Sequence, residues 1–124
     1  MFTKILVGTD GSPTAAKAVD RAVQVAANAG ASLMIFTAGS KAKGEAVVAA
    51  EAARHADAGI ALTTKVVDTD AVSGLIEEAT AGGFDLLVMG NKGMTGVTRF
   101  FRLGSVPNKV THHLPCSLLI VKTT

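Results

Sequence analysis

Residues 3–19 read TKILVGTDGSPTAAKAV, an apolar segment followed at once by the start of a helix. The first part, residues 3–9, is largely apolar and includes the β-branched Ile5 and Val7, as in a buried parallel strand. The turn-forming residues at 10–11 end this strand. The stretch therefore predicts a β-strand that leads directly into a helix.

Signals for both ends of this first helix are present. Ser12 is a preferred N-cap residue, and Pro13 suits the first helical position because its φ is already fixed. Gly30 suits the position just after a helix, so the helix is predicted to end at Ala29. Apolar residues at helical spacing form its inward face: Ala15, Ala18, Val19, Ala22, Val23 and Ala26.

The rest of the chain repeats this alternation of strand and helix. Further strands are predicted at 32–38, 60–67, 84–89 and 117–122, and further helices at 45–58, 72–81 and 105–113. Residues 39–44 are expected to form a short polar loop. Strict alternation predicts one α/β domain over residues 1–124, with an open parallel sheet and helices on both of its faces.

Charged side chains are unevenly distributed along the chain. Residues 1–85 hold seven basic and ten acidic side chains, whereas residues 86–124 hold five basic and none acidic. A local positive field favours an anionic partner, although a solvated basic surface is the simpler alternative. Nucleic acid is a poor candidate because the excess is small and the chain has no Trp or Tyr for base stacking.

The sequence also bears on the cellular compartment. Cys116 is the single cysteine, which excludes an internal disulfide. No run of about 18 apolar residues predicts a membrane span, and the first residues lack the pattern of a signal peptide. We therefore expect a cytoplasmic protein without a membrane association. Between Pro115 and an apolar strand, Cys116 is expected to be a small buried residue rather than a nucleophile.

Two segments that follow predicted strands are candidates for a ligand site, residues 10–12 and residues 90–93. In open parallel sheets, ligands bind beyond the carboxyl ends of the strands, where the strand order reverses. These two segments meet there only if the first and fourth strands are neighbours, as they are in the order 3-2-1-4-5.

The segment from Gly90 to Ser105 carries the stronger signal. Gly90 and Gly93 allow backbone N–H groups to approach an anion closely, and Gly104 precedes a helix whose free N–H groups favour a phosphate. Lys92 and two arginines lie between these ends. The alternative is a plain β-α connection in which Ser105 is an ordinary N-cap. Together these features favour a phosphate site.

Several familiar arrangements are missing from the sequence. No G-x-G-x-x-G follows the first strand and no G-x-x-x-x-G-K-[ST] occurs, which argues against a dinucleotide site and a P-loop. No Ser-His-Asp or Cys-His arrangement is compelling. His112 and His113 lack the further ligands a zinc site needs and suit the end of the last helix. We expect no catalytic residues and no protein-held metal site.

The sequence resembles the universal stress protein family over its whole length, most specifically in ILVGTDGSPTAAKAV at 5–19 and in residues 85–121. Nucleotide-binding members carry G-x2-G-x9-G-[ST]. Here residues 90–93, GNKG, match the first half and residues 104–105, GS, match the second. The resemblance implies a Rossmann-like sheet of order 3-2-1-4-5, an ATP-binding cleft and a homodimer.

The resemblance also implies which residues bind the nucleotide. Asp10 corresponds to an acidic residue near the ribose or adenine, although it also suits a turn that caps the first helix. Ala38 corresponds to a position whose backbone contacts adenine, and glycines and Ser105 correspond to the phosphate-binding residues. The full expected set is Thr9, Asp10, Ala38, Met89, Gly90, Asn91, Gly93, Gly104, Ser105 and Val106. The ligand is expected to be ATP, with Mg²⁺ or Mn²⁺ beside its phosphates if a metal is needed.

Two departures from the family pattern stand out. Ten residues separate Gly93 from Gly104, where the family has nine. The segment after the second strand is also shorter than is usual in the family, which leaves one side of the cleft more open.

The function expected from these features is that of a dimeric, ATP-binding stress-response regulator with little or no hydrolysis. Asp10 is the only carboxylate in the expected cleft, which argues against an efficient enzyme. A slow ATPase and a dimeric interaction module that has lost nucleotide binding are the alternatives, the second favoured by the ten-residue spacing. An apolar edge strand at 117–121 is the expected dimer contact.

Overall fold

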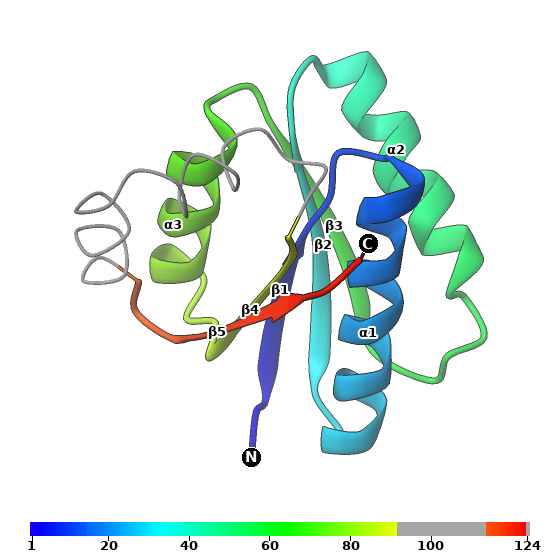
Figure 1. The fold of residues 1–124 in the computed structure, drawn as a ribbon, viewed down its shortest axis with the longest axis vertical. Coiled ribbons are helices and arrows are strands. Elements are labelled where there is room, and N and C mark those ends of the chain that lie inside the picture. The colour runs from blue at the N-terminus through cyan, green and yellow to red at the C-terminus, as the bar shows by residue number, and fades with distance from the viewer. Residues whose placement is uncertain (92–113, 124) are drawn as a thin grey trace.

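The computed structural model describes residues 1–91 and 114–123 and shows an open sheet of five parallel strands. The strands are β1 (Lys4–Gly8), β2 (Ser32–Ala38), β3 (Leu62–Val67), β4 (Leu86–Gly90) and β5 (Ser117–Val121). Their order is β3-β2-β1-β4-β5 (Figure 1). The predicted fold class and strand order are therefore confirmed.

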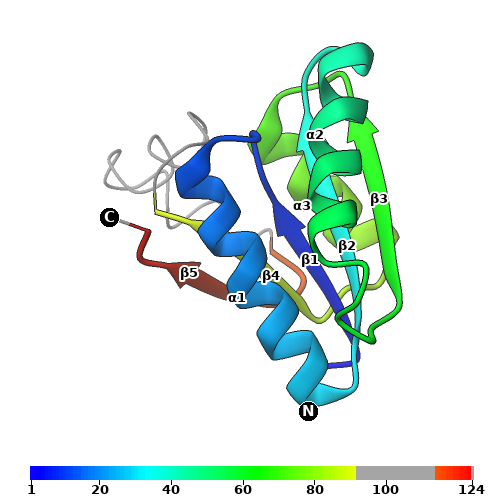
Figure 2. The same cartoon turned by 90° about the vertical axis from the view of Figure 1, so that its right-hand side faces the viewer.

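Helices cover both faces of this sheet. They are α1 (Pro13–Ala29), α2 (Lys41–Arg54) and α3 (Ala71–Ala81). Figure 2 shows α1 and α2 on one face and α3 on the other. Of the helices that the structure describes, none is long and apolar enough to cross a membrane.

The first helix has the bounds and caps that its sequence predicts. The Ser12 hydroxyl accepts a hydrogen bond from the Ala15 N–H at 3.1 Å, and Pro13 occupies the first turn. Gly30 ends the helix with a φ of 67°, in the left-handed region that glycine adopts without strain. All six residues of the predicted inward face are buried.

The predicted bounds of the second helix, residues 45–58, are wrong. In the structure α2 spans Lys41–Arg54, and only Gly39 and Ser40 separate it from β2. Gly44 lies inside the helix, where an added Cβ would collide with the Val66 side chain of β3. A glycine that resembles a loop residue in sequence therefore serves close packing of a helix on a strand.

Smaller differences occur at other element ends. β3 begins two residues after the predicted start, and α3 begins at Ala71, with the Asp70 carboxylate accepting the Ser73 N–H at 3.1 Å. Gly90, predicted to open a loop, is instead the last residue of β4 and pairs with Val121 of β5. The predicted helix at 105–113 lies outside the described residues.

Each face of the sheet has its own apolar core. One core lies beneath α1 and includes Ile5, Val7 and Val48 of α2. The other lies beneath α3 and includes Leu6 and Phe36. β1 is at the centre of both because successive side chains of a strand point to opposite faces. This doubly buried strand holds the loop that follows it in a fixed position.

Arg54 joins the two helices on the first face. Its Nε donates to Glu51 at 2.7 Å and its terminal nitrogen donates to Asp20 of α1 at 2.8 Å, while His55 approaches the same Asp20 oxygen at 3.0 Å. Partial burial lowers the pKa of Arg54, but the hydrogen bonds to the two carboxylates outweigh it and raise the pKa above its usual value. This network fixes α2 against α1.

Candidate functional site

The carboxyl ends of β1 and β4 lie side by side, at the point where the strand order reverses. The register pairs Val7 with Val88, so the residues that follow Gly8 and Met89 emerge at the same edge. This meets the condition under which the segments at 10–12 and 90–93 form one site. The location of the ligand site at this topological switch point stays a prediction.

The loop after β1 is held in a tight turn. The Thr9 N–H donates to the Phe36 carbonyl of β2 at 2.9 Å, and the Thr9 hydroxyl accepts from the Gly11 N–H at 3.1 Å. Gly11 has a φ of 83°, and a Cβ there would lie 2.7 Å from the Val47 side chain. Both space and conformation thus require glycine at this turn.

Asp10 has the turn role that its sequence context suggests. Its Oδ1 accepts a hydrogen bond from the Ser12 N–H at 2.9 Å, while the residue remains exposed. This Asx turn orders the start of α1. The carboxylate stays exposed, so its role in the turn leaves it accessible to a ligand at this edge of the sheet.

The end of β2 also lies at this edge of the sheet. Ala38 is half-buried and pairs with Val67, and the next N–H, that of Gly39, donates to the Val67 carbonyl at 2.9 Å. β2 is the neighbour of β1 on the side away from β4. Ala38 therefore lies at the same edge of the sheet as Asp10, and it packs against the core beneath α3.

The end of β4 is anchored more firmly than its sequence suggests. Met89 and Gly90 are buried, and the Asn91 N–H donates to the Val121 carbonyl at 3.0 Å. The Asn91 Oδ1 accepts two further hydrogen bonds, from the N–H and from the hydroxyl of Thr123, each at 2.9 Å. Sequence reasoning named Asn91 but missed Thr123, since no motif signals a contact between residues so far apart.

The remaining predicted site residues, Gly93, Gly104, Ser105 and Val106, lie outside the described residues, as do Lys92, Arg99 and Arg102. Six of the ten expected positions are described, and all six occur at the carboxyl edge of the sheet: Thr9, Asp10, Ala38, Met89, Gly90 and Asn91. Within residues 1–91 and 114–123, no three His, Cys, Asp or Glu side chains gather closely enough to hold a metal ion.

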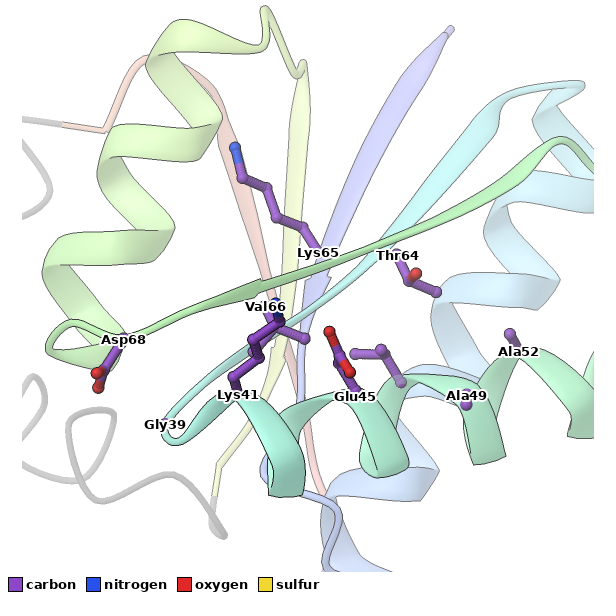
Figure 3. A pocket seen from close by; sticks show the side chains of 10 residues that line it. Gly39, Lys41, Glu45, Ala49, Ala52, Thr64, Lys65, Val66 and Asp68 are labelled. Atoms are coloured by element: carbon purple, nitrogen blue, oxygen red, sulfur yellow. The ribbon is translucent and has the colours of Figure 1, made fainter.

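A groove of about 620 Å³ lies elsewhere, between α2 and the edge strand β3. Figure 3 shows Lys41 and Glu45 on α2 beside Val66, whereas Lys65 points away from the helix. Lys65 pairs instead with Glu78 of α3 at 2.5 Å. The residues that line this groove include none of the ten predicted site residues.

Cys116 does not have the environment of a reactive thiol. It is half-buried just before β5, and burial, together with the negative charge of Asp85, raises its pKa above the usual value. Because the thiolate is the reactive form, the native protein is expected to react with iodoacetamide more slowly than the urea-unfolded protein at pH 8. The two rates are compared by mass spectrometry; an equal or faster native rate would contradict a shielded thiol.

The fold and the site define a class of protein, a doubly wound α/β domain with its polar loops gathered at the switch point. Comparison with known proteins gives the family. Residues 1–50 and 36–122 match the model of the universal stress protein family, and the chain belongs to this family.

Individual relatives match over their full length. The chain is 30% identical to Universal stress protein YxiE of Bacillus subtilis (strain 168), in an alignment that covers 98% of this chain and 100% of that protein. It is 34% identical to Universal stress protein Rv1636 of Mycobacterium tuberculosis (strain ATCC 25618 / H37Rv), covering 99% and 98%. A crystal structure of a universal stress protein in complex with cAMP superimposes with a TM-score of 0.78 at 32% identity, covering 99% of both chains.

Proposed function

We propose that this protein binds an adenine nucleotide, with ATP as its ligand, at the carboxyl ends of β1 and β4. The observation that carries the proposal is the juxtaposition of the Asp10 loop with Gly90 and Asn91 at the switch point. The solved relative in complex with cAMP, at 32% identity, supports an adenine nucleotide as the ligand class.

Three of the described residues have a proposed role that their geometry allows. The exposed Asp10 carboxylate accepts hydrogen bonds from the nucleoside, at the ribose or the adenine. The backbone at Ala38 contacts the adenine. Gly90 brings the backbone of β4 close to the phosphates, because it has no side chain to hold them away. Gly93, Gly104 and Ser105 complete the phosphate contacts in this proposal, and Mg²⁺ or Mn²⁺ accompanies the ATP.

The protein is proposed to act as a regulatory module of the stress response rather than as an efficient enzyme. In this proposal the Asp10 carboxylate contacts the nucleoside, which is remote from the γ-phosphate that hydrolysis would release. A general base must be within hydrogen-bond reach of the proton it removes and must be able to accept it. Hydrolysis is therefore proposed to be slow or absent.

A homodimer through β5 completes the proposal. β5 is an edge strand whose apolar Leu118, Leu119 and Ile120 are only partly buried. A second copy paired along this edge across a two-fold axis would cover these side chains and the free backbone groups. The cytoplasm is the proposed location.

Calorimetric titration with ATP, ADP, AMP and cAMP, each with and without Mg²⁺, tests this function. We expect saturable binding of ATP with a Kd below about 1 mM. A Kd of about 1 mM corresponds to a binding free energy of about −4 kcal/mol, so the expected binding is more favourable than this. GTP under the same conditions is the control for recognition of adenine. Absence of ATP binding at millimolar concentration would overturn the proposal. It would instead favour the dimeric interaction module, for which the ten residues between Gly93 and Gly104 already argue.

A further inference from the structure

Thr123, two residues after the end of β5, is bound to the candidate site through Asn91. Its N–H and its hydroxyl both donate to the Asn91 Oδ1 at 2.9 Å. The acceptor must be the amide oxygen of Asn91, because a backbone N–H can only donate. Thr123 is 3% exposed, so a lost hydrogen bond here leaves a polar group without water to replace its partner.

Lys17 also engages the backbone of Thr123. Its Nζ donates to the Thr123 carbonyl at 3.1 Å. Lys17 lies on α1, the helix that follows the Asp10 loop. The carbonyl, the N–H and the hydroxyl of Thr123 are thus all engaged, and they connect α1 to the end of β4.

These contacts continue the sheet where regular pairing stops. Gly90 is the last residue of β4 to pair with β5, and the Asn91 N–H adds one more hydrogen bond, to Val121. The Asn91 side chain then engages Thr123. The backbone direction at Gly90 and Asn91 is therefore set by residues that follow β5 and not by β4 alone.

We propose that Thr123 and Lys17 are positioning residues for the nucleotide phosphates. They hold the Gly90–Asn91 backbone in the orientation in which it meets the ligand, without touching the ligand themselves. This inference rests on the proposed function. It differs from a purely structural role because it predicts an effect that depends on the phosphates rather than on the nucleoside.

The decisive comparison is between ATP and adenosine, titrated into wild-type protein and into Thr123→Val. This substitution keeps the shape of the side chain and the backbone N–H but removes the hydroxyl donor. We expect the ATP affinity to fall about fivefold, the effect of one intramolecular hydrogen bond, and the adenosine affinity to stay within about twofold. Lys17→Met, which removes the contact to the Thr123 carbonyl, should produce the same selective loss.

Two variants serve as controls. Thr123→Ser keeps the hydroxyl donor and should bind ATP with the wild-type affinity. Thr63→Val makes the same chemical change at an exposed position on β3, away from the cleft, and should leave both affinities unchanged. Hydrogen exchange at the Asn91 amide provides a readout that needs no ligand; faster exchange is expected in Thr123→Val.

The possible outcomes separate the two proposals. If wild-type protein binds no ATP, the proposed function fails and this inference fails with it. If wild-type protein binds ATP and Thr123→Val binds it equally well, only the positioning role is overturned. A parallel loss of ATP and adenosine affinity would also overturn it, since that pattern indicates a general structural role.

Discussion

Replacing Phe36 with alanine is expected to lower the free energy of unfolding by about 3–5 kcal/mol. Phe36 lies on the interior strand β2, is 0% exposed and belongs to the core beneath α3. Its ring reaches to within 3.1 Å of the position that a Cβ on Gly74 would occupy, so α3 packs directly against it. Alanine would leave a cavity that this tightly apposed helix could close only in part.

Urea denaturation followed by far-UV circular dichroism measures this effect, because the chain has no Trp or Tyr to report by fluorescence. Phe36→Leu is the matched control and is expected to cost less than about 1.5 kcal/mol, since most of the volume remains. A loss below about 1 kcal/mol for Phe36→Ala would show that α3 collapses onto the vacated space, contrary to rigid packing of α3 on β2.

Much of this fold could be predicted because its signals are local. Ser12, Pro13 and Gly30 mark the two ends of α1 through backbone chemistry that does not depend on the rest of the chain. The alternation of strands and helices then restricts the topology, because parallel strands need crossovers of one hand. The strand order itself was implied by the family resemblance.

The misplaced second helix shows where local signals stop. Gly44 and the polar residues around it resemble a loop, and the preference of glycine for non-helical conformations supports that interpretation. In the structure Gly44 lies inside α2, and this position needs glycine because the Val66 side chain leaves no room for a Cβ. This is a tertiary contact, and nothing within residues 39–44 indicates it.

The same distinction applies to the candidate site. Asp10 and Gly90 directly follow predicted strands. Because ligands of open parallel sheets bind beyond the carboxyl ends of the strands, both residues could be assigned to one site from the sequence. Thr123 and Lys17 are separated by 106 positions and carry no motif. Their contact with the site arises only from the pairing of β4 with β5 and from the packing of α1.

The second large effect is expected for Asp10→Ala, which should weaken ATP binding by about 10- to 100-fold. A hydrogen bond that involves a charged group contributes about 1.5–3 kcal/mol, and the exposed Asp10 carboxylate is the charged group at the nucleoside end of the proposed site. The substitution also removes the acceptor for the Ser12 N–H, which loosens the turn before α1.

Asp10→Asn separates these two contributions. The amide oxygen of asparagine preserves the Asx turn with Ser12 but carries no charge, so ATP affinity should fall by an intermediate amount. Calorimetric titration of both variants gives the affinities, and circular dichroism verifies that the fold is retained. An unchanged ATP affinity in Asp10→Ala would place the nucleoside elsewhere.

Titration with 2′-deoxy-ATP and 3′-deoxy-ATP then locates the contact. If Asp10 binds a ribose hydroxyl, the penalty of Asp10→Ala should nearly vanish for the analogue that lacks that hydroxyl, because protein group and ligand group form one interacting pair. If Asp10 binds the adenine, the penalty should be the same for ATP and for both analogues. The two arrangements use the same carboxylate at the end of β1, and the double-mutant cycle distinguishes them by which ligand group is coupled to it.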